Sequence, residues 1–161
     1  DLGKQLLPVG MLVVLDSVFN RIIRNRRLGR STWVYIDEIY LLFQHEYSAN
    51  FLFTLWKRVR KYGACCTGLT QNVDDLLQSH TARTMLANSE FLVMLNQAGT
   101  DRAELARLLN ISDNQLSYIT NVDFGRGLIK CGSAIVPFMD HFPRNRLYRL
   151  MTTKLSETNA A

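Results

Sequence analysis

The sequence predicts a three-layer α/β fold in which a mainly parallel sheet is covered by helices on both faces. Short β-branched and aromatic runs lack the alternation of a half-exposed strand, which is typical of strands buried on both faces. Segments with apolar residues at helical spacing separate these runs. Strands that alternate with helices of ten or more residues form parallel sheets. The 161 residues, 47% of them hydrophobic, suffice for one globular core, so we expect a single domain.

The chain is expected to begin with a long helix. Between Pro8 and Leu28 the apolar residues recur at helical spacing, and Gly29 suits a left-handed cap. The later elements expected are a strand at 32–36, a helix capped by Ser48 and ended by Gly63, a strand at 64–69, a helical stretch at 73–87, a strand at 91–95, helices at 101–109 and 113–119, and two closing strands at 127–131 and 134–138. The polar residues 152–161 are expected to form a disordered tail, which leaves 1–151 as the domain.

Composition sets broad limits on the class of protein. The formal charge of +5 and the pI near 9.3 permit nucleic acid or other anionic partners without requiring them. Cys65, Cys66 and Cys131 show no metal-ligand or CxxC spacing, so we expect inert thiols in a reducing, cytosolic setting.

No segment is expected to cross a membrane, because charged residues or Asn interrupt every apolar stretch well short of about 20 residues. The opening residues 1–4 include neither an initiator Met nor a signal pattern, so we expect a domain taken from a longer protein. His45, His80 and His141 are too scattered in sequence for a metal motif.

Two carboxylates follow the first predicted strand, in the run Trp33-Val34-Tyr35-Ile36-Asp37-Glu38. Ligands bind at the carboxyl ends of strands in open α/β sheets. In P-loop NTPases an Asp at this place holds Mg²⁺ through water, and a following Glu polarises the attacking water. The alternative is that Asp37 and Glu38 begin and cap the next helix, and this strand by itself leaves both interpretations open.

A polar pair follows the second predicted strand. Thr70 and Gln71 reach the same sheet edge as Asp37 if the two strands are neighbours. A Gln at that place can hydrogen-bond the γ-phosphate and the attacking water, which is a sensor role. The alternative is that Gln71 is a loop amide that begins the following helix. The acidic doublet and the amide together favour an ATPase.

Four segments carry a resemblance to a known family: TWVYIDEIYLLF, LWKRVRKYG, CTGLTQNVDDLL and ARTMLANSEFLVMLNQ. They closely resemble the large conjugal-transfer ATPase of type IV secretion systems, especially the form carried by Gram-positive conjugative elements. The likeness extends from about Leu2 to Glu157. These ATPases are similar to the coupling proteins and to the FtsK and HerA translocases, which are RecA-like motors that work as ring oligomers.

The resemblance implies a set of site residues and cofactors. It implies ATP and Mg²⁺ as cofactors, with Thr70 and Gln71 on the nucleotide side. The implied roles are Asp37 as the Walker B magnesium residue, Glu38 as the catalytic carboxylate, Gln71 as the sensor, and Arg60-Lys61 and Arg126 as basic motifs able to reach a neighbouring subunit's nucleotide. The alternatives are a solvated helix end for Arg60-Lys61 and a turn residue for Arg126.

One part of the family pattern is missing, because the sequence has no GxxxxGK[ST] phosphate-binding loop. Gly3-Lys4 and Gly29-Arg30 lack the required spacing. We expect the loop to lie upstream in the parent protein and the 161 residues to be inactive alone. The resemblance further implies a ring oligomer, which is a hexamer in this family, with other secretion components as partners, and a place at the cytoplasmic face of the membrane, held there by partners. It leaves open whether the transported cargo is DNA, protein or both.

Two other functions remain open on the sequence. Residues 101–120 fit a helix-turn-helix template with Asn110 in the turn, as in a DNA-binding regulator. The second helix of that template has no Lys or Arg for phosphates, so a structural helical hairpin is favoured. The chain could also be a non-catalytic interaction module that docks a partner on an exposed face around Tyr40, Phe43, His45 and Tyr47. The alternative for Tyr40 and Phe43 is that both belong to the core.

Overall fold

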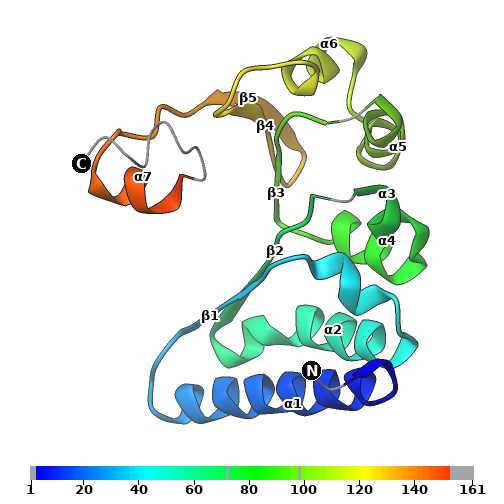
Figure 1. Ribbon diagram of the computed structural model, residues 1–161, viewed down its shortest axis with the longest axis vertical. Helices are drawn as coiled ribbons and strands as arrows, with labels where there is room; N and C mark the ends of the chain where they lie inside the picture. The colour runs from blue at the N-terminus through cyan, green and yellow to red at the C-terminus, as the bar shows by residue number, and fades with distance from the viewer. Residues whose placement is uncertain (1–2, 72, 98, 153–161) are drawn as a thin grey trace. The chain divides into compact units, whose positions relative to one another are not determined.

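The computed structural model describes residues 3–71, 73–97 and 99–152. The chain divides into two compact units, residues 1–89 and 90–161, and each is described by itself (Figure 1). Of the tail expected at 152–161, only Thr152 lies within the described residues.

The first unit joins two strands and six helical segments. These are α1 (Gly3–Arg27), β1 (Thr32–Ile36), η1 (Ile39–Phe43), α2 (Glu46–Arg58), η2 (Val59–Tyr62), β2 (Ala64–Gly68), α3 (Val73–Gln78) and α4 (His80–Ala87). As expected, Gly29 and Gly63 adopt left-handed conformations where α1 and η2 end. The helical stretch expected at 73–87 is interrupted because the Ser79 side chain accepts a hydrogen bond from the Ala82 N–H and starts α4.

The expected cap of α2 is a correction. The helix begins at Glu46, two residues before Ser48, with His45 at the N-cap. Ser48 is buried, and its hydroxyl donates to the carbonyls of Leu42 and His45. The side chain therefore ties η1 to the first turn of α2 instead of accepting from a free backbone N–H.

Helices α1 and α2 lie side by side beneath the strands of the first unit (Figure 1). Phe19 of α1 makes edge-to-face contacts with Phe51 and Tyr62, at centroid distances of 6.4 and 5.4 Å. Ile22 and Leu52 are fully buried in the core between these elements.

The strands of the first unit are covered on one face, which corrects the expectation of burial on both. Val34 and Ile36 pack against the helical core, whereas Trp33 and Tyr35 point the other way and are 64% and 66% exposed. The side chains of a strand alternate between faces. Because the exposed side chains of β1 include two aromatic residues, its sequence reads as a continuous apolar run, which is the pattern of a strand buried on both faces.

The first helix bears on the expectation that no segment crosses a membrane. The segment Leu6–Arg27 is long and apolar enough to cross a membrane by length and composition, although Asp16 and Arg21 lie within it. Core helices of soluble proteins and signal sequences meet the same criterion, so this is weak evidence for a span. The end of α1 nearest Ile22 packs on α2.

The second unit is built around a three-stranded sheet. Its elements are β3 (Phe91–Met94), α5 (Gly99–Leu109), α6 (Asp113–Leu116), η3 (Ser117–Ile119), β4 (Arg126–Cys131), β5 (Ala134–Met139) and α7 (Arg146–Met151). The expected hairpin is present, with Gly132 in a left-handed turn. Strand β3 lies in a separate sheet from β1 and β2 and pairs antiparallel with β4.

The helix-turn-helix interpretation is not supported by this unit. Asn110 takes the expected left-handed turn, and Leu105 and Leu109 are buried. The helix after the turn, however, comprises only the four residues of α6, followed by the short η3. A recognition helix must lie along the major groove, which a single turn cannot do. The segment is a structural hairpin, closed by a capping box between Ser112 and Gln115.

Candidate functional site

Two neighbouring strands bring the predicted polar residues together at one edge of the sheet, the edge formed by the carboxyl ends of the strands. Strands β1 and β2 pair in parallel with Ile36 opposite Gly68. Asp37 and Glu38 follow Ile36, and Thr70 and Gln71 follow one residue beyond Gly68. The acidic doublet and the amide therefore leave adjacent strands at the same end, which is the arrangement that the sequence predicted.

The turn that carries the two acids is fixed to the end of β2 by backbone hydrogen bonds. The Leu69 N–H donates to the Ile36 carbonyl at 2.8 Å, and the Ile39 N–H donates to the Leu69 carbonyl at 2.9 Å. Asp37 and Glu38 lie between these two bonds, and Asp37 Oδ1 accepts from the Glu38 N–H at 3.0 Å. Any displacement of Leu69 would therefore be transmitted to the acidic turn.

Glu38 is held in an unfavourable state in two respects. Its backbone is left-handed, with φ 47° and ψ 47°, which costs a residue other than glycine about 1–2 kcal/mol. Its Oε2 atom is buried and has no hydrogen-bond partner among the described residues. Such strain and unmet hydrogen-bonding capacity gather at functional sites.

The helix-capping interpretation of the acidic doublet fits this geometry poorly. Glu38 occupies the N-cap of η1, yet its side chain makes no capping hydrogen bond. Asp37 is exposed, and its Oδ1 accepts a hydrogen bond from the N–H of the next residue rather than from a residue inside the helix. The backbone of Glu38 therefore starts η1, because its carbonyl accepts from the Leu41 N–H, whereas neither carboxylate accepts a hydrogen bond from inside η1.

Gly68 makes room for this turn, and sequence reasoning missed it. A Cβ on Gly68 would lie 2.5 Å from Cδ1 of Ile39, the buried residue directly after Glu38. The glycine thus lets η1 pack against the end of β2. The available signal was a glycine inside a strand run, which marks close approach of another chain segment.

Thr70 is half-buried, whereas Gln71 is exposed at the edge. An exposed amide at this position is accessible to a ligand bound over the ends of the two strands. Among the described residues no group of three His, Cys, Asp or Glu side chains is close enough to form a complete metal site. The role of Asp37 as a magnesium residue therefore stays a prediction.

Arg60 and Lys61 lie at the opposite edge of the strands. They belong to η2, which ends at Gly63, and the Gly63 carbonyl accepts from the N–H of Thr32, the first residue of β1. A five-residue strand separates the two edges by about 15 Å. The basic pair is exposed, and the geometry prevents it from contacting a ligand beside Asp37 of the same unit.

Arg126 lies in the second unit, as the first residue of β4. It forms a surface ion pair with Asp123 at 3.7 Å. The glycines on either side are required by packing, since a Cβ on Gly125 would lie 2.3 Å from the Asp140 carbonyl oxygen and one on Gly127 would lie 2.2 Å from that of Met94. Close packing thus explains both glycines of this Gly-Arg-Gly motif. The arginine side chain between them is 49% exposed and is not required by packing in this way.

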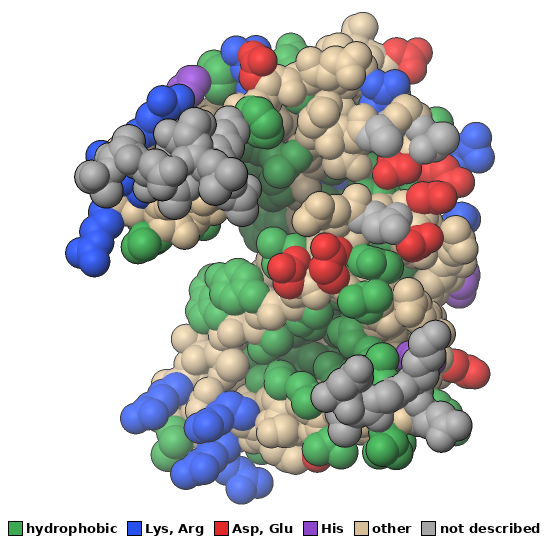
Figure 2. Space-filling model, viewed as in Figure 1, with side chains coloured by type: hydrophobic (Ala, Val, Ile, Leu, Met, Phe, Trp, Pro, Cys, Tyr) green, Lys and Arg blue, Asp and Glu red, His purple; other side chains and the backbone are tan. Residues whose placement is uncertain are grey.

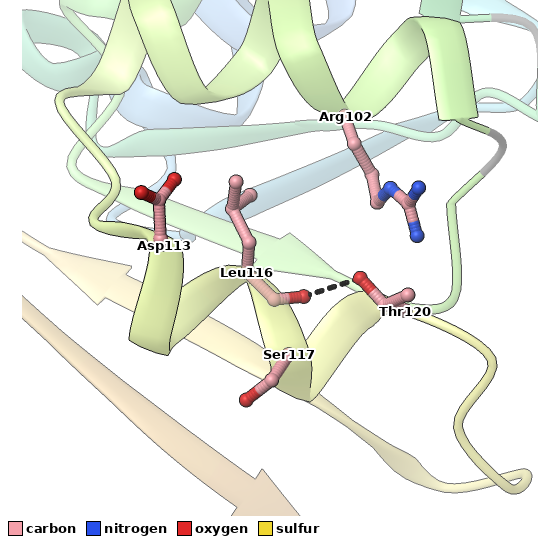
Figure 3. A pocket seen from close by; sticks show the side chains of 5 residues that line it. All are labelled: Arg102, Asp113, Leu116, Ser117 and Thr120. Carbon is pink, nitrogen blue, oxygen red and sulfur yellow. Dashed lines mark hydrogen bonds between the residues drawn. The ribbon is translucent and has the colours of Figure 1, made fainter.

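An open hollow in the second unit is a weaker candidate site. Arg102, Asp113, Leu116, Ser117 and Thr120 line it (Figure 3). The Thr120 hydroxyl already donates to the Leu116 carbonyl at 2.6 Å. The basic and acidic side chains in the lining oppose each other in charge, so the hollow favours no one class of ligand.

The residues of the alternative docking face around Tyr40 do not lie on one exposed surface. Tyr40 and Phe43 pack against the core of the first unit, and His45 is half-buried. Tyr47 alone of the four is largely exposed, at 77%. The expected face is therefore divided between core and surface.

Comparison with known proteins identifies the relatives of this chain. A family model described as the TraG P-loop domain matches residues 3–126. A solved structure of VirB4 of Thermoanaerobacter pseudethanolicus is 27% identical, with a TM-score of 0.72, and the match covers 81% of this chain and 36% of that one. No curated protein matches the sequence. The expected RecA-like α/β fold and conjugal-transfer ATPase family are confirmed.

Proposed function

Because the chain belongs to the TraG P-loop domain family, we propose that it supplies the Walker B and sensor side of an ATPase site in a type IV secretion or conjugation motor. The observation that carries this proposal is the state of Glu38, which lies beside Asp37 and one strand away from Gln71. Its backbone is left-handed, and its Oε2 has no hydrogen-bond partner among the described residues. The phosphate-binding loop comes from outside these 161 residues, which contain no GxxxxGK[ST] motif. The chain alone therefore hydrolyses no ATP.

Each residue has a separate task in this site. Asp37 holds Mg²⁺ through water with its exposed carboxylate, and Thr70 and Gln71 contact the nucleotide side of the edge. When bound, Mg²⁺ and ATP supply the phosphoryl group and neutralise its charge. Glu38 orients the attacking water and accepts its proton on the side-chain carboxylate. The two hydrogen bonds of Leu69 keep this carboxylate in place.

The test is Glu38→Gln in the parent protein, compared with Glu46→Gln. Loss of the carboxylate removes proton acceptance but keeps the shape of the side chain, so ATP hydrolysis should fall at least about 100-fold while nucleotide binding persists. Glu46 is an exposed glutamate in the first turn of α2 and should tolerate the same change. Unchanged turnover in Glu38→Gln would remove Glu38 from the mechanism.

The arginines act on the nucleotide of a neighbouring subunit. Arg60 and Lys61 lie at the strand edge away from Asp37, so they serve a site in trans, and the half-exposed Arg126 is a second candidate finger. An arginine finger contributes about a thousandfold or more to hydrolysis.

A mixing experiment tests this assignment in the parent protein. Arg60→Ala and Glu38→Gln should each be inactive, whereas their mixture should recover part of the hydrolysis, because some interfaces combine an intact Glu38 with an intact Arg60. Arg126→Ala is tested in the same way. A mixture that stays inactive for both arginines would contradict action in trans.

The parent motor assembles as a ring with other secretion components at the cytoplasmic face of the membrane, and it couples hydrolysis to substrate transfer or pilus assembly. DNA is one candidate for the transferred substrate, and this candidate is tested by measuring the affinity for duplex DNA at rising salt concentration. Phosphate contacts weaken steeply with salt, so a transported duplex should bind with a steep negative salt slope. Binding that is absent at low salt would remove DNA from the substrates.

A further inference from the structure

The charged residues of the first unit are separated between the two edges of its strands. Four acidic residues lie at the carboxyl ends of the strands or in the helical turn that follows. We call these the acidic edge: Asp37, Glu38, Asp74 and Asp75. Seven basic residues lie at the other end, where α1 and η2 stop and the strands begin. We call these the basic edge: Arg24, Arg26, Arg27, Arg30, Arg58, Arg60 and Lys61.

The basic edge is one continuous surface. Arg26 Nη1 lies 3.5 Å from the position that a Cβ on Gly63 would occupy, so the end of α1 meets the end of η2. The contact between Phe19 and Tyr62 joins the same two elements about two turns of α1 before Arg26. Figure 2 shows basic side chains gathered at the lower left, where α1 ends in Figure 1.

The cations of the basic edge form no ion pair within the part of their own unit that the structure describes. All seven are exposed, and none forms an ion pair with a carboxylate among the described residues. The carboxyl ends of α1 and α2 favour nearby cations, but this effect is limited to the last helical turn. Seven like charges gathered on one surface repel one another, and an anionic partner would relieve this repulsion.

A surface of matching charge exists on the opposite end of the same unit. The acidic edge of a second copy presents carboxylates at the ends of two strands, in the same fold. Because the two edges lie at opposite ends of one sheet, contact between them is head-to-tail, and such contacts close into rings or extend as filaments. No other molecule is required to explain the unpaired cations.

We propose that the basic edge of one copy docks on the acidic edge of the next copy, with the arginines of α1 and Arg30 forming the contact beside Arg60 and Lys61. The proposal rests on the ring assembly in the proposed function, and it assigns the surfaces that meet. It also gives a docking role to Arg24, Arg26, Arg27 and Arg30, which no site motif includes.

The experiment reverses charge on each edge and measures association of the chain by sedimentation velocity at 50 and 500 mM NaCl. One variant is Arg24→Glu with Arg27→Glu, and the other is Asp74→Arg. None of these residues belongs to the proposed catalytic machinery. Each variant alone should associate at least tenfold more weakly than the original chain, and high salt should weaken the original chain as well. A mixture of the two should regain association, because each reversed edge then meets a complementary one.

Arg107→Glu with Arg144→Glu is the matched control, since it makes the same charge change on exposed residues of the second unit. It should associate as the original chain does. Circular dichroism checks the fold, and the milder Arg24→Gln with Arg27→Gln replaces any reversed variant that unfolds.

Three outcomes would overturn the proposal: a chain that stays monomeric at 50 mM NaCl, a mixture that fails to associate, or reversed variants that lose only binding to duplex DNA. The last would assign the basic edge to nucleic acid. The assay contains no nucleotide, so its failure leaves the hydrolysis test of Glu38 intact and is distinguishable from failure of the proposed function.

Discussion

The two units place left-handed backbone at different kinds of residue. In the second unit the left-handed positions are Asn110, Asn121, Gly125 and Gly132, which are residue types that tolerate this conformation. The first unit uses glycine at Gly29 and Gly63 but also places Glu38 there. The second unit thus turns its chain where the sequence makes turning easy. In the first unit the same geometry is imposed on a carboxylate at a sheet edge, which indicates a functional constraint.

The largest expected effect is on the second unit, where glycine is required by close packing. Gly127→Ala would place a methyl group against the Met94 carbonyl of the neighbouring strand, so the free energy of unfolding should fall by about 3 kcal/mol. Gly132→Ala has open space around it and should lose only about 1–2 kcal/mol for its left-handed backbone. Chemical denaturation measures both, and equal losses would show that backbone conformation, rather than packing, limits this unit.

A smaller effect tests the left-handed residues directly. Glu38→Gly removes the backbone strain and the unpartnered oxygen, so the free energy of unfolding should rise by about 1 kcal/mol while hydrolysis by the parent is lost. Asn110→Glu imposes the strain of Glu38 on the second unit and should lower stability by a similar amount. A destabilised Glu38→Gly variant would contradict the claim that Glu38 is kept for function.

The smallest expected effect on stability concerns the thiols of the two units. Burial and the neighbouring Cys65 raise the pKa of Cys66 from 9.0 to about 11, whereas Cys131 is exposed on the second unit. At pH 8 Cys66 should react with a thiol reagent about 100-fold more slowly than an exposed cysteine, because less of it is thiolate.

The sign of the pH effect follows from the same shift. The folded state holds the Cys66 proton more tightly than the unfolded state, so stability is unaffected below about pH 9 and falls as the pH rises toward about 11. Mass spectrometry of labelled peptides gives the rates, with the unfolded chain in denaturant as the control. Equal labelling of Cys65 and Cys66 in the folded chain would show that β2 is not covered on its Cys66 face.

The candidate site could be predicted because it depends on local order along two strands. A run such as residues 32–36 followed by two acids, and a second run followed by Thr-Gln, become neighbours in any parallel pairing of consecutive strands. The strain at Glu38 could not be predicted, because it arises from two hydrogen bonds to Leu69 and from the packing of Ile39 against Gly68. The roles of the site residues and the boundaries of the domain stay predictions.

The distance of the basic pair from the acidic turn could not be predicted from the sequence either. The motif that contains Arg60 and Lys61 was visible in the sequence, but its distance from Asp37 depends on which ends of β1 and β2 lie together. The pairing of β3 with β4 could not be predicted, because the four apolar residues of β3 are compatible with either direction of pairing.

The sequence by itself determined most of the helices and strands through their periodicity, and the residue types at the strand ends through local order along the chain. The family followed from the resemblance of four segments. Only the tertiary structure decided which face of β1 is covered, which edge carries the cations and which carboxylate is strained. These properties depend on contacts between residues far apart in sequence, and a local pattern contains no information about the partner it will meet.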